Sequence, residues 1–196
     1  MEKVFARDWF SSRLSVCSSP HLAKPFSVSR NSMKDNINIF EFDGILTERN
    51  WLIYIVEISK NFDKLYYIGK VGDNRDGCNP IISRIGNHFS FNKIHSQLRN
   101  KLEVNTNEYN YKVYTLNIGT YRLENRLYFR EKINEFERYT NQQMQKHFNK
   151  TQILNPFAGK YITKKESERR KTILNIAEKE QVENLIKIIL NNGKQI

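Results

Sequence analysis

The chain has 196 residues and a net charge of +11, from 32 lysines and arginines against 21 aspartates and glutamates. Its 10 tyrosines, 12 phenylalanines and 2 tryptophans can fill a core, which argues against low-complexity disorder over most of the length. No apolar run approaches the ~18 residues of a membrane span, so we expect a soluble chain. Cys17 and Cys78 can build neither a disulfide scaffold nor a zinc site alone. The charge favours a polyanion, with nucleic acid before an anionic membrane surface, although a solvated basic surface has the same composition.

Residues 1–48 are rich in serine and other small polar residues, with only isolated apolar pairs. We interpret this segment as an N-terminal arm. Few acids precede Asp35, as in a mitochondrial presequence, but Glu2 and Asp8 are unusual in one. We therefore expect a cytoplasmic, nucleoid-associated protein, and targeting to an organelle is the alternative.

A β-hairpin is predicted where the ordered part of the chain begins. Residues 51–58 are mostly β-branched or aromatic and read as a buried strand. The polar residues 61–64 supply turn chemistry, and residues 65–71 form a second strand. Two strands joined by so short a loop predict an antiparallel pair.

Helical and strand patterns then alternate along the chain. Apolar residues recur at helical spacing over 81–102, with a break near 90–92. Residues 111–118 alternate as a third strand, and a helix is predicted from 119 towards 148. The tail over 173–190 is amphipathic. The predicted order is strand, strand, helix, strand, helix and tail helix.

Four polar residues occupy informative places in these elements. Tyr54 and Tyr67 lie one in each strand of the hairpin, and the register decides whether both face one site. Arg84 and His88 are four residues apart, on one face of the first helix. Arginine suits phosphate, and histidine can transfer protons or bind a phosphate oxygen. Taken singly, each is equally explained as a sheet tyrosine, a surface arginine or a half-buried histidine.

Glu124 is the candidate metal ligand. It follows the third strand by six residues, early in the predicted second helix and between Leu123 and Leu127. A carboxylate at the border of a packed face can bind a hard divalent cation. The alternative is an acidic residue favoured by the helix dipole.

Together, and in this order, these features resemble the GIY-YIG nuclease family. The resemblance covers about residues 51–157 and leaves both ends uncovered. The matching elements are, in chain order, Leu52-Ile53-Tyr54, an intact Tyr67-Ile68-Gly69, Arg84 with His88, the third strand, Leu123-Glu124-Asn125-Arg126-Leu127 and Asn155.

Two departures from the family pattern affect the assignment. Leu52 replaces the glycine of the first motif, which concerns strand packing more than chemistry because the tyrosine is kept. The gap from Glu124 to Asn155 is longer than in many members, so Glu131, Glu135 or Glu137 could take the ligand role. We prefer Glu124 for its short distance from the third strand and its local match.

The resemblance implies an α+β fold in which helices flank a small three-stranded antiparallel sheet. We expect a nuclease domain over 49–158, after the arm of 1–48, and a basic, amphipathic helical tail over 159–196. The resemblance also implies hydrolysis of DNA phosphodiester bonds with one Mg²⁺ or Mn²⁺ per active site. Because one active site cuts one strand, double-strand cleavage would need a homodimer or two successive nicks.

The same resemblance assigns roles to the matched residues. Tyr54 is the general base or proton relay, and Lys70 and His88 are cations that favour its phenolate form. Tyr67 orients the water or binds the scissile phosphate, and Arg84 stabilises charge in the transition state. Glu124 holds the metal, which acts as a Lewis acid. Structural roles fall to Gly69 and Asn155.

Binding of a long polyanion needs more positive charge than the site itself supplies. The predicted DNA contacts are Lys93, Arg99, Arg122, Arg126, Lys164 and Lys165. We therefore expect a metal-dependent endonuclease, site-specific and either restriction-like or of the mobile-element kind. The alternatives are a non-catalytic basic nucleic-acid-binding module on the same fold, and a protein-interaction domain with a basic surface.

Overall fold

The chain divides into two compact units, Met1–Glu41 and Phe42–Ile196. The computed structural model describes residues 41–72, 78–102, 106–157 and 163–192. The predicted N-terminal arm lies almost wholly outside the described residues. None of the described helices has the length and apolar character that crossing a membrane requires.

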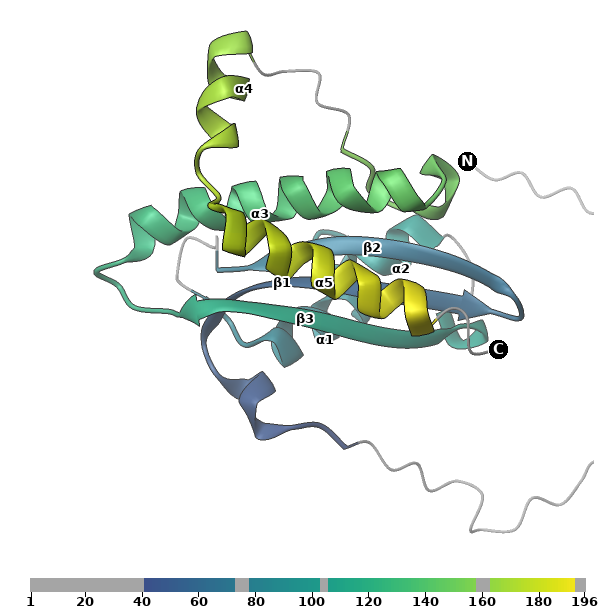
Figure 1. The fold of residues 1–196 in the computed structure, drawn as a ribbon. Coiled ribbons are helices and arrows are strands. Elements are labelled where there is room, and N and C mark those ends of the chain that lie inside the picture. Colours follow the sequence, from purple (N-terminus) through teal and green to yellow (C-terminus); the bar gives the residue numbers. More distant parts are fainter. Residues whose placement is uncertain (1–40, 73–77, 103–105, 158–162, 193–196) are drawn as a thin grey trace, which may run out of the picture. The chain divides into compact units, whose positions relative to one another are not determined.

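The second unit is a three-stranded antiparallel sheet flanked by five α-helices among the described residues (Figure 1). The predicted α+β fold is thereby confirmed. The elements are η2 (Gly44–Thr47), β1 (Asn50–Lys60), β2 (Asp63–Val71), α1 (Ile81–Phe89), α2 (Gln97–Leu102), η3 (Thr106–Glu108), β3 (Asn110–Thr120), α3 (Arg126–His147), η4 (Lys150–Gln152), α4 (Lys164–Lys171) and α5 (Ile176–Asn192).

β1 is the central strand, in the order β2-β1-β3. It is buried from Asn50 to Ile58, which explains its continuous apolar run, because a central strand covered on both faces has no polar side. The β1–β2 turn consists of Asn61 and Phe62, and Asn61 has a φ of 56°. Asparagine tolerates this left-handed conformation better than most residues, so the turn chemistry predicted here has a definite backbone role.

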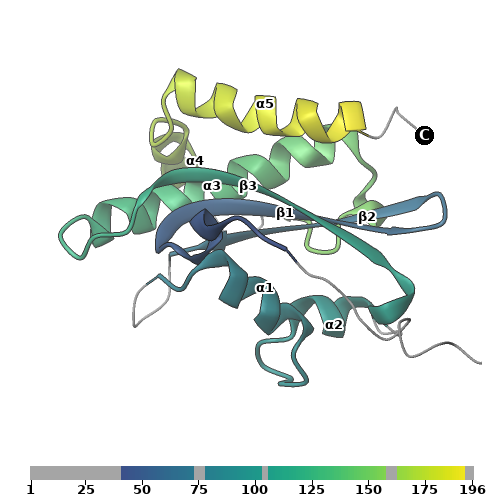
Figure 2. The same cartoon turned by 90° about the horizontal axis from the view of Figure 1, so that it is seen from below.

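The two faces of the sheet are covered by different helices (Figure 2). Trp51, Ile53 and Ile55 of β1 belong to one apolar core with residues of α3 and α5. The alternate residues of β1 face α1 and α2 in a second core. The helix α5 contributes four buried residues to the first core, so its apolar stripe packs within this unit: Val182, Leu185, Ile186 and Ile189.

The start of the second long helix differs from the prediction. β3 continues to Thr120, and α3 begins only at Arg126. The amide of Tyr121 donates to the carbonyl oxygen of Arg49 at 2.9 Å, which keeps the chain beside the start of β1. Glu124 therefore lies in a turn and not in a helix.

Candidate functional site

The hydroxyl of Tyr54 is the centre of a polar cluster between β1 and α1. His88 Nε2 lies 2.6 Å from this hydroxyl, and Arg84 Nε donates to it at 3.3 Å. Both partners come from one face of α1, where the four-residue spacing places them one turn apart. Tyr54 and His88 are fully buried, so this cluster is part of the second core and is not a set of surface contacts.

Gly69 of β2 makes room for the Tyr54 ring. The two residues are paired across the strands, and an added Cβ on Gly69 would lie 2.2 Å from Cζ of Tyr54. That distance is far below any ordinary contact, so a side chain here would displace the ring. The glycine of the Tyr67-Ile68-Gly69 motif thus positions the hydroxyl of Tyr54 opposite α1.

Burial controls the protonation of the cluster. It raises the pKa of Tyr54 far above its ordinary value, although the positive charge of Arg84 opposes this shift. Burial also lowers the pKa of His88 to about 4, and Arg84 acts in the same direction. His88 is therefore neutral at pH 7. The prediction that His88 favours phenolate as a cation is wrong, because a buried imidazole beside a guanidinium gives up its proton.

One nitrogen of His88 has no partner. Nδ1 is buried and makes no hydrogen bond to any described residue. A buried, unsatisfied polar atom lowers the stability of the fold by about 1–3 kcal/mol. A purely structural role would therefore not favour an imidazole at this position. An apolar side chain of similar size would fill the same space without that cost.

Tyr67 lies beside this cluster on the same face of the sheet. Its ring centroid is 6.4 Å from that of Tyr54 and 5.0 Å from that of His88. Burial raises the pKa of Tyr67, and Glu137 contributes to the increase while Arg84 opposes it. Its hydroxyl makes no hydrogen bond with any described residue, so it is available to a ligand. The register thus places both predicted tyrosines on one face.

Lys70 lies on the opposite face of the sheet from Tyr54. It is paired with Ile53 of β1, and its Nζ lies 3.1 Å from Oε2 of Glu137 on α3. The ammonium group also donates to Oδ1 of Asn134, one turn earlier on the same helix. The prediction that Lys70 is a cation beside the Tyr54 phenol is wrong, because the alternation of β2 directs this side chain to α3. Arg84 has that position instead.

Glu137 is the carboxylate whose charge acts on the cluster. It lies close enough to the two phenols to contribute to the raised pKa values of Tyr54 and Tyr67, after the larger effect of burial. Its side chain is partly exposed, at 32%. A ligand could therefore reach it without unfolding the helix.

The other candidate carboxylates lie elsewhere. Glu124, the predicted metal ligand, is exposed in the turn before α3. Glu131 pairs with Arg169 of α4, and buried Glu135 pairs with Arg138 on its own helix. The prediction that Glu124 lies early in a helix is wrong, and Glu137 replaces it as the candidate carboxylate. The later start of α3 removes Glu124 from the helix, and Glu137 is carried to the β2 edge by the packing of α3.

Asn155 holds the chain at the outer edge of β2. Its Oδ1 accepts from the amide of Ile68 at 3.1 Å, and its Nδ2 donates to the carbonyl oxygen of Ile68 at 2.6 Å. The amide of Leu154 also donates to the carbonyl oxygen of Tyr66 at 2.9 Å. The side-chain amide thus replaces a neighbouring strand and holds this loop against the edge strand.

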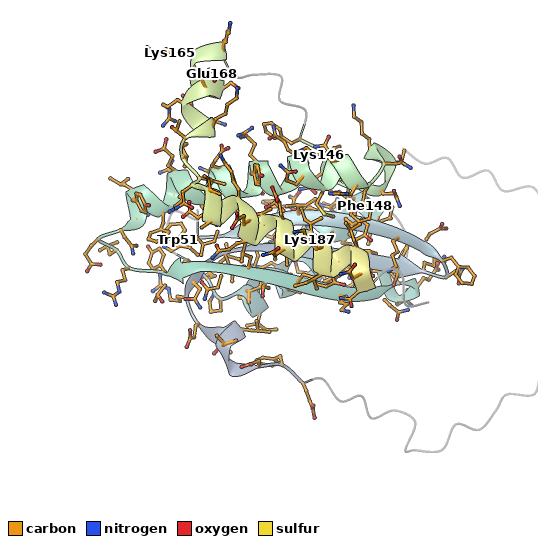
Figure 3. All side chains as sticks on the ribbon, viewed as in Figure 1. Trp51, Lys146, Phe148, Lys165, Glu168 and Lys187 are labelled. Carbon is orange, nitrogen blue, oxygen red and sulfur yellow. The ribbon has the colours of Figure 1, made fainter. Side chains whose placement is uncertain are left out.

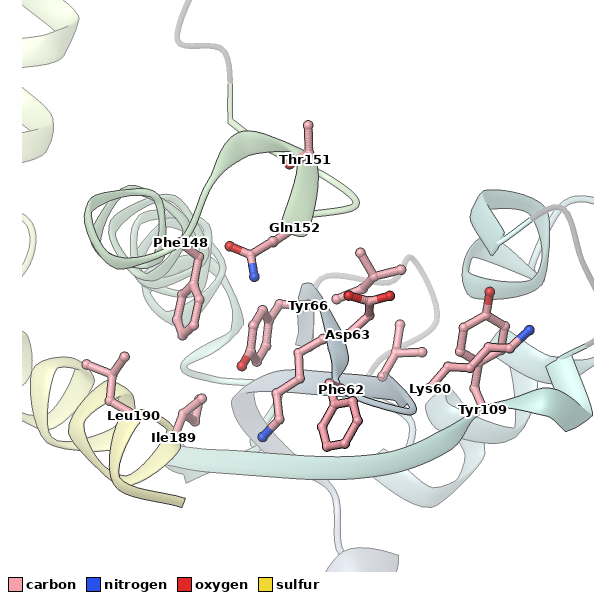
Figure 4. A pocket seen from close by; sticks show the side chains of 13 residues that line it. Lys60, Phe62, Asp63, Tyr66, Tyr109, Phe148, Thr151, Gln152, Ile189 and Leu190 are labelled. Carbon is pink, nitrogen blue, oxygen red and sulfur yellow. The ribbon is translucent and has the colours of Figure 1, made fainter. Parts of the chain in front are cut away.

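Two cavities lie near these elements. One of about 410 Å³ is lined by Glu137 and Asn134 of α3, with Asn155 and Arg170. Another of about 650 Å³ lies near the β1–β2 turn and is lined by aromatic residues that include Tyr66 and Phe148 (Figure 4). No residue of the Tyr54 cluster lines either cavity. The smaller one adjoins the candidate site only through Glu137 and Asn134 of α3.

The six predicted DNA contacts lie in three places. Lys93 and Arg99 belong to the α1–α2 region, Arg122 and Arg126 flank the turn that holds Glu124, and the last pair begins α4. Lys165 points away from the rest of the unit (Figure 3). Neither Lys164 nor Lys165 has an ion pair with a described residue, whereas the later basic residues of α4 are paired with acids: Arg169, Arg170 and Lys171.

No family model, curated protein or solved structure matches this chain. Glu137 and Asn134 are the site residues that the sequence analysis did not select. The available signal was their spacing, because residues 134, 137 and 141 fall on one face of a helix.

Proposed function

We propose that this chain is a metal-dependent endonuclease that hydrolyses phosphodiester bonds in DNA, as its resemblance to GIY-YIG nucleases suggests. The observation that carries the proposal is the Tyr54 hydroxyl, which contacts His88 Nε2 and Arg84 Nε. The charge of Glu137 on α3 contributes to the raised pKa of this hydroxyl, after the larger effect of burial. Burial of these polar groups opposes folding, and packing alone does not require them. The net charge of +11 supports a polyanionic substrate.

Glu137 and Asn134 would hold the metal. Mg²⁺ takes oxygen ligands, is often bound through one or two carboxylates, and completes its shell with waters and substrate phosphates. The described residues contain no group of three or more acidic, histidine or cysteine side chains that could enclose an ion. The ammonium group of Lys70 contacts both the Glu137 carboxylate, at 3.1 Å, and Oδ1 of Asn134, so the ion would have to displace it. When bound, the ion would act as a Lewis acid on the phosphate.

Arg84 is the phosphate-binding residue in this proposal. Its Nε contacts Tyr54, and its terminal nitrogens make no hydrogen bond with a described residue, so they remain available to phosphate oxygens. The guanidinium also stabilises the extra negative charge that develops at phosphorus. The hydroxyl of Tyr67 orients the attacking water.

Tyr54 and His88 form a proton relay. The water transfers a proton to the Tyr54 hydroxyl oxygen, and the hydroxyl proton passes to Nε2 of neutral His88. No phenolate accumulates, and the proton ends on His88. Burial and then Arg84 lower the pKa of His88, so the imidazole becomes a better proton acceptor when Arg84 moves towards a bound phosphate. Because Tyr54 is fully buried, the relay requires the bound phosphate to draw Arg84 outward and admit the water.

That burial also favours the alternative function. A fully covered Tyr54 is what a non-catalytic, basic nucleic-acid-binding module would show if it kept the fold and lost the chemistry. The two functions differ in one property, because only the nuclease needs a carboxylate and a divalent ion. Cleavage in the presence and absence of Mg²⁺ therefore separates them.

The test is cleavage of supercoiled plasmid and phage DNA with Mg²⁺ or with EDTA. We expect discrete fragments with Mg²⁺ only, as for a site-specific enzyme, and a loss of at least about 100-fold in Glu137→Gln. Glu124→Gln is the matched control and should cut like the wild type. Loss of cleavage in Glu124→Gln but not in Glu137→Gln would contradict the assignment of Glu137 as the metal ligand. Salt-sensitive binding without any cleavage would establish the binding module.

A further inference from the structure

Two large apolar side chains protrude from the loop that joins α1 to α2. Phe91 is 87% exposed and Ile94 is 75% exposed. The loop projects from the side of these helices that faces away from the sheet (Figure 2). Burying such side chains would be worth about 1.5–3 kcal/mol each, so their display forgoes stability that a collapsed loop would gain.

Hydrogen bonds hold this loop in its extended position. The carbonyl oxygen of Asn92 accepts from the amides of His95 and Ser96, and its Oδ1 accepts from the amide of Ile94 at 2.9 Å. The side chain of Asn100 donates to the carbonyl oxygen of Lys93 at 2.8 Å. The exposed side chains are therefore presented by a preformed loop, which reduces the entropy that binding must overcome.

Arg99 fixes the aromatic side chain. Its Nε and Nη2 donate to the carbonyl oxygen of Phe89 at 3.1 and 2.8 Å, and its guanidinium lies 4.1 Å from the ring centroid of Phe91. The Phe91 ring thus has a cation against one face. A ring with an attached positive charge is complementary to a stacked base next to a phosphate.

The surroundings of the loop identify the class of partner. Lys93 stands exposed between the two apolar residues, and no acidic residue occurs from 81 to 102. This combination of apolar tips and positive charge complements the base steps and phosphates of a duplex, where phenylalanine and isoleucine side chains act as wedges. The loop also directly follows α1, which carries Arg84 and His88, so a duplex held at the candidate site would extend towards it.

We propose that Phe91 and Ile94 form a wedge that enters between base pairs of duplex DNA beside the cleaved phosphate. The proposal rests on the proposed nuclease function. Insertion separates and partly unstacks a base step, so it unwinds the duplex locally. The bend that accompanies insertion brings the neighbouring phosphates closer to Lys93 and to the candidate site.

The test is unwinding of a relaxed plasmid in EDTA, where metal-dependent cleavage is blocked. A metal-independent topoisomerase sets the linking number while the protein is bound, and topoisomers are then resolved on a gel. We expect the wild type to shift the distribution and the double variant Phe91→Ala/Ile94→Ala to abolish the shift. The double variant should also lower DNA affinity about tenfold, as the loss of base stacking predicts.

Phe62→Ala is the matched control. Phe62 is 92% exposed at the β1–β2 turn, between Lys60 and Lys64. The Phe62→Ala protein should unwind the plasmid like the wild type. Urea denaturation should show all variants equally stable, since the changed side chains are exposed. An unchanged topoisomer shift in the double variant, or an equal loss in Phe62→Ala, would overturn the wedge.

The wedge and the nuclease can fail separately. A wild-type protein that cuts DNA with Mg²⁺ but never unwinds it in EDTA would overturn the wedge alone. A protein that unwinds through Phe91 and Ile94 but never cuts would support the wedge and remove the nuclease. Absence of any DNA binding would overturn both, and the two exposed side chains would then belong to a partner of another class.

Discussion

The two faces of β1 are equally buried but differ in chemistry. The face towards α3 and α5 packs apolar side chains such as Trp51, Ile53 and Phe136 against each other. The face towards α1 and α2 buries the phenol of Tyr54 against an imidazole that has an unsatisfied nitrogen. Each face buries a polar atom with no partner among the described residues, Nε1 of Trp51 on the first and Nδ1 of His88 on the second. The second face also joins a hydroxyl, an imidazole and a guanidinium at one point, so the two faces differ in chemistry and not in how well their polar atoms are satisfied.

The largest effect is expected on the apolar face. Phe136→Ala removes a fully buried ring from the first core, and the remaining cavity should lower the free energy of unfolding by about 4 kcal/mol. Urea denaturation monitored by circular dichroism measures this. A loss below about 1 kcal/mol would mean that this core is loosely packed and the division between the faces is wrong.

Gly69→Ala tests how closely the polar face is fitted. The added methyl group would meet the ring of the fully buried Tyr54. We therefore expect the free energy of unfolding to fall by about 3 kcal/mol, at the upper end of the usual cost of an overpacked core. In a Tyr54→Ala background the same change should cost less than about 1 kcal/mol. A double-mutant cycle measures the difference. Equal costs in both backgrounds would show that Gly69 is required for its backbone and not for the ring.

Tyr54→Phe separates chemistry from packing on the same face. The ring is kept, so stability should fall by only about 1–2 kcal/mol, from the hydrogen-bond partner that His88 loses. Cleavage should fall at least about 100-fold, because the relay loses its hydroxyl. Single-turnover kinetics at saturating DNA would measure the chemical step. A Phe variant that cuts at the wild-type rate would assign the base to Tyr67 or to another group.

The sheet was predictable because its signals are local. A continuous apolar run, a short polar turn and a second apolar strand specify the hairpin without knowledge of what covers it. The start of α3 was not predictable in this way. Leu123 and Leu127 have helical spacing, but they are 73% and 81% exposed and pack into no core. Periodicity shows where apolar residues recur, and not whether another element covers them.

The candidate site also contains residues that local spacing predicts and residues whose position depends on long-range packing. Arg84 and His88 were found because both lie on one short helix, four residues apart. Glu137 was weighed but not preferred, because its place depends on how α3 packs across the edge of β2, a contact between segments far apart in the sequence. The protonation of His88 also depends on burial, which the sequence does not display.

Acid should destabilise the polar face through His88. Burial lowers the pKa of this residue to about 4 in the folded chain, against an ordinary value of 6.5. Below pH 6.5 the unfolded chain therefore binds more protons, so stability falls as the pH falls towards 4. Between pH 8 and pH 5 the titration of His88 should lower the free energy of unfolding by about 2 kcal/mol. Urea unfolding at both pH values measures it.

His88→Gln is the control for this pH dependence. The variant has no titrating imidazole, so the difference in stability between pH 8 and pH 5 should shrink by about 2 kcal/mol relative to the wild type. Carboxylates elsewhere titrate in both proteins and cancel in the comparison. An identical pH dependence in the two proteins would mean that the imidazole reaches solvent and is not held neutral.

The smallest effect on stability is expected at the start of α4, which belongs to neither face. Lys164 and Lys165 are exposed, and neither has an ion pair with a described residue, so Lys164→Ala/Lys165→Ala should change stability by less than about 0.5 kcal/mol. If both lysines contact phosphates, the slope of log affinity against log salt should decrease by about 2. Fluorescence anisotropy with duplex DNA at several salt concentrations measures it. Lys171→Ala, which removes a lysine paired with Glu168, should leave the slope nearly unchanged. An equal decrease in both variants would show that the net charge of the chain, and not these two positions, sets the affinity.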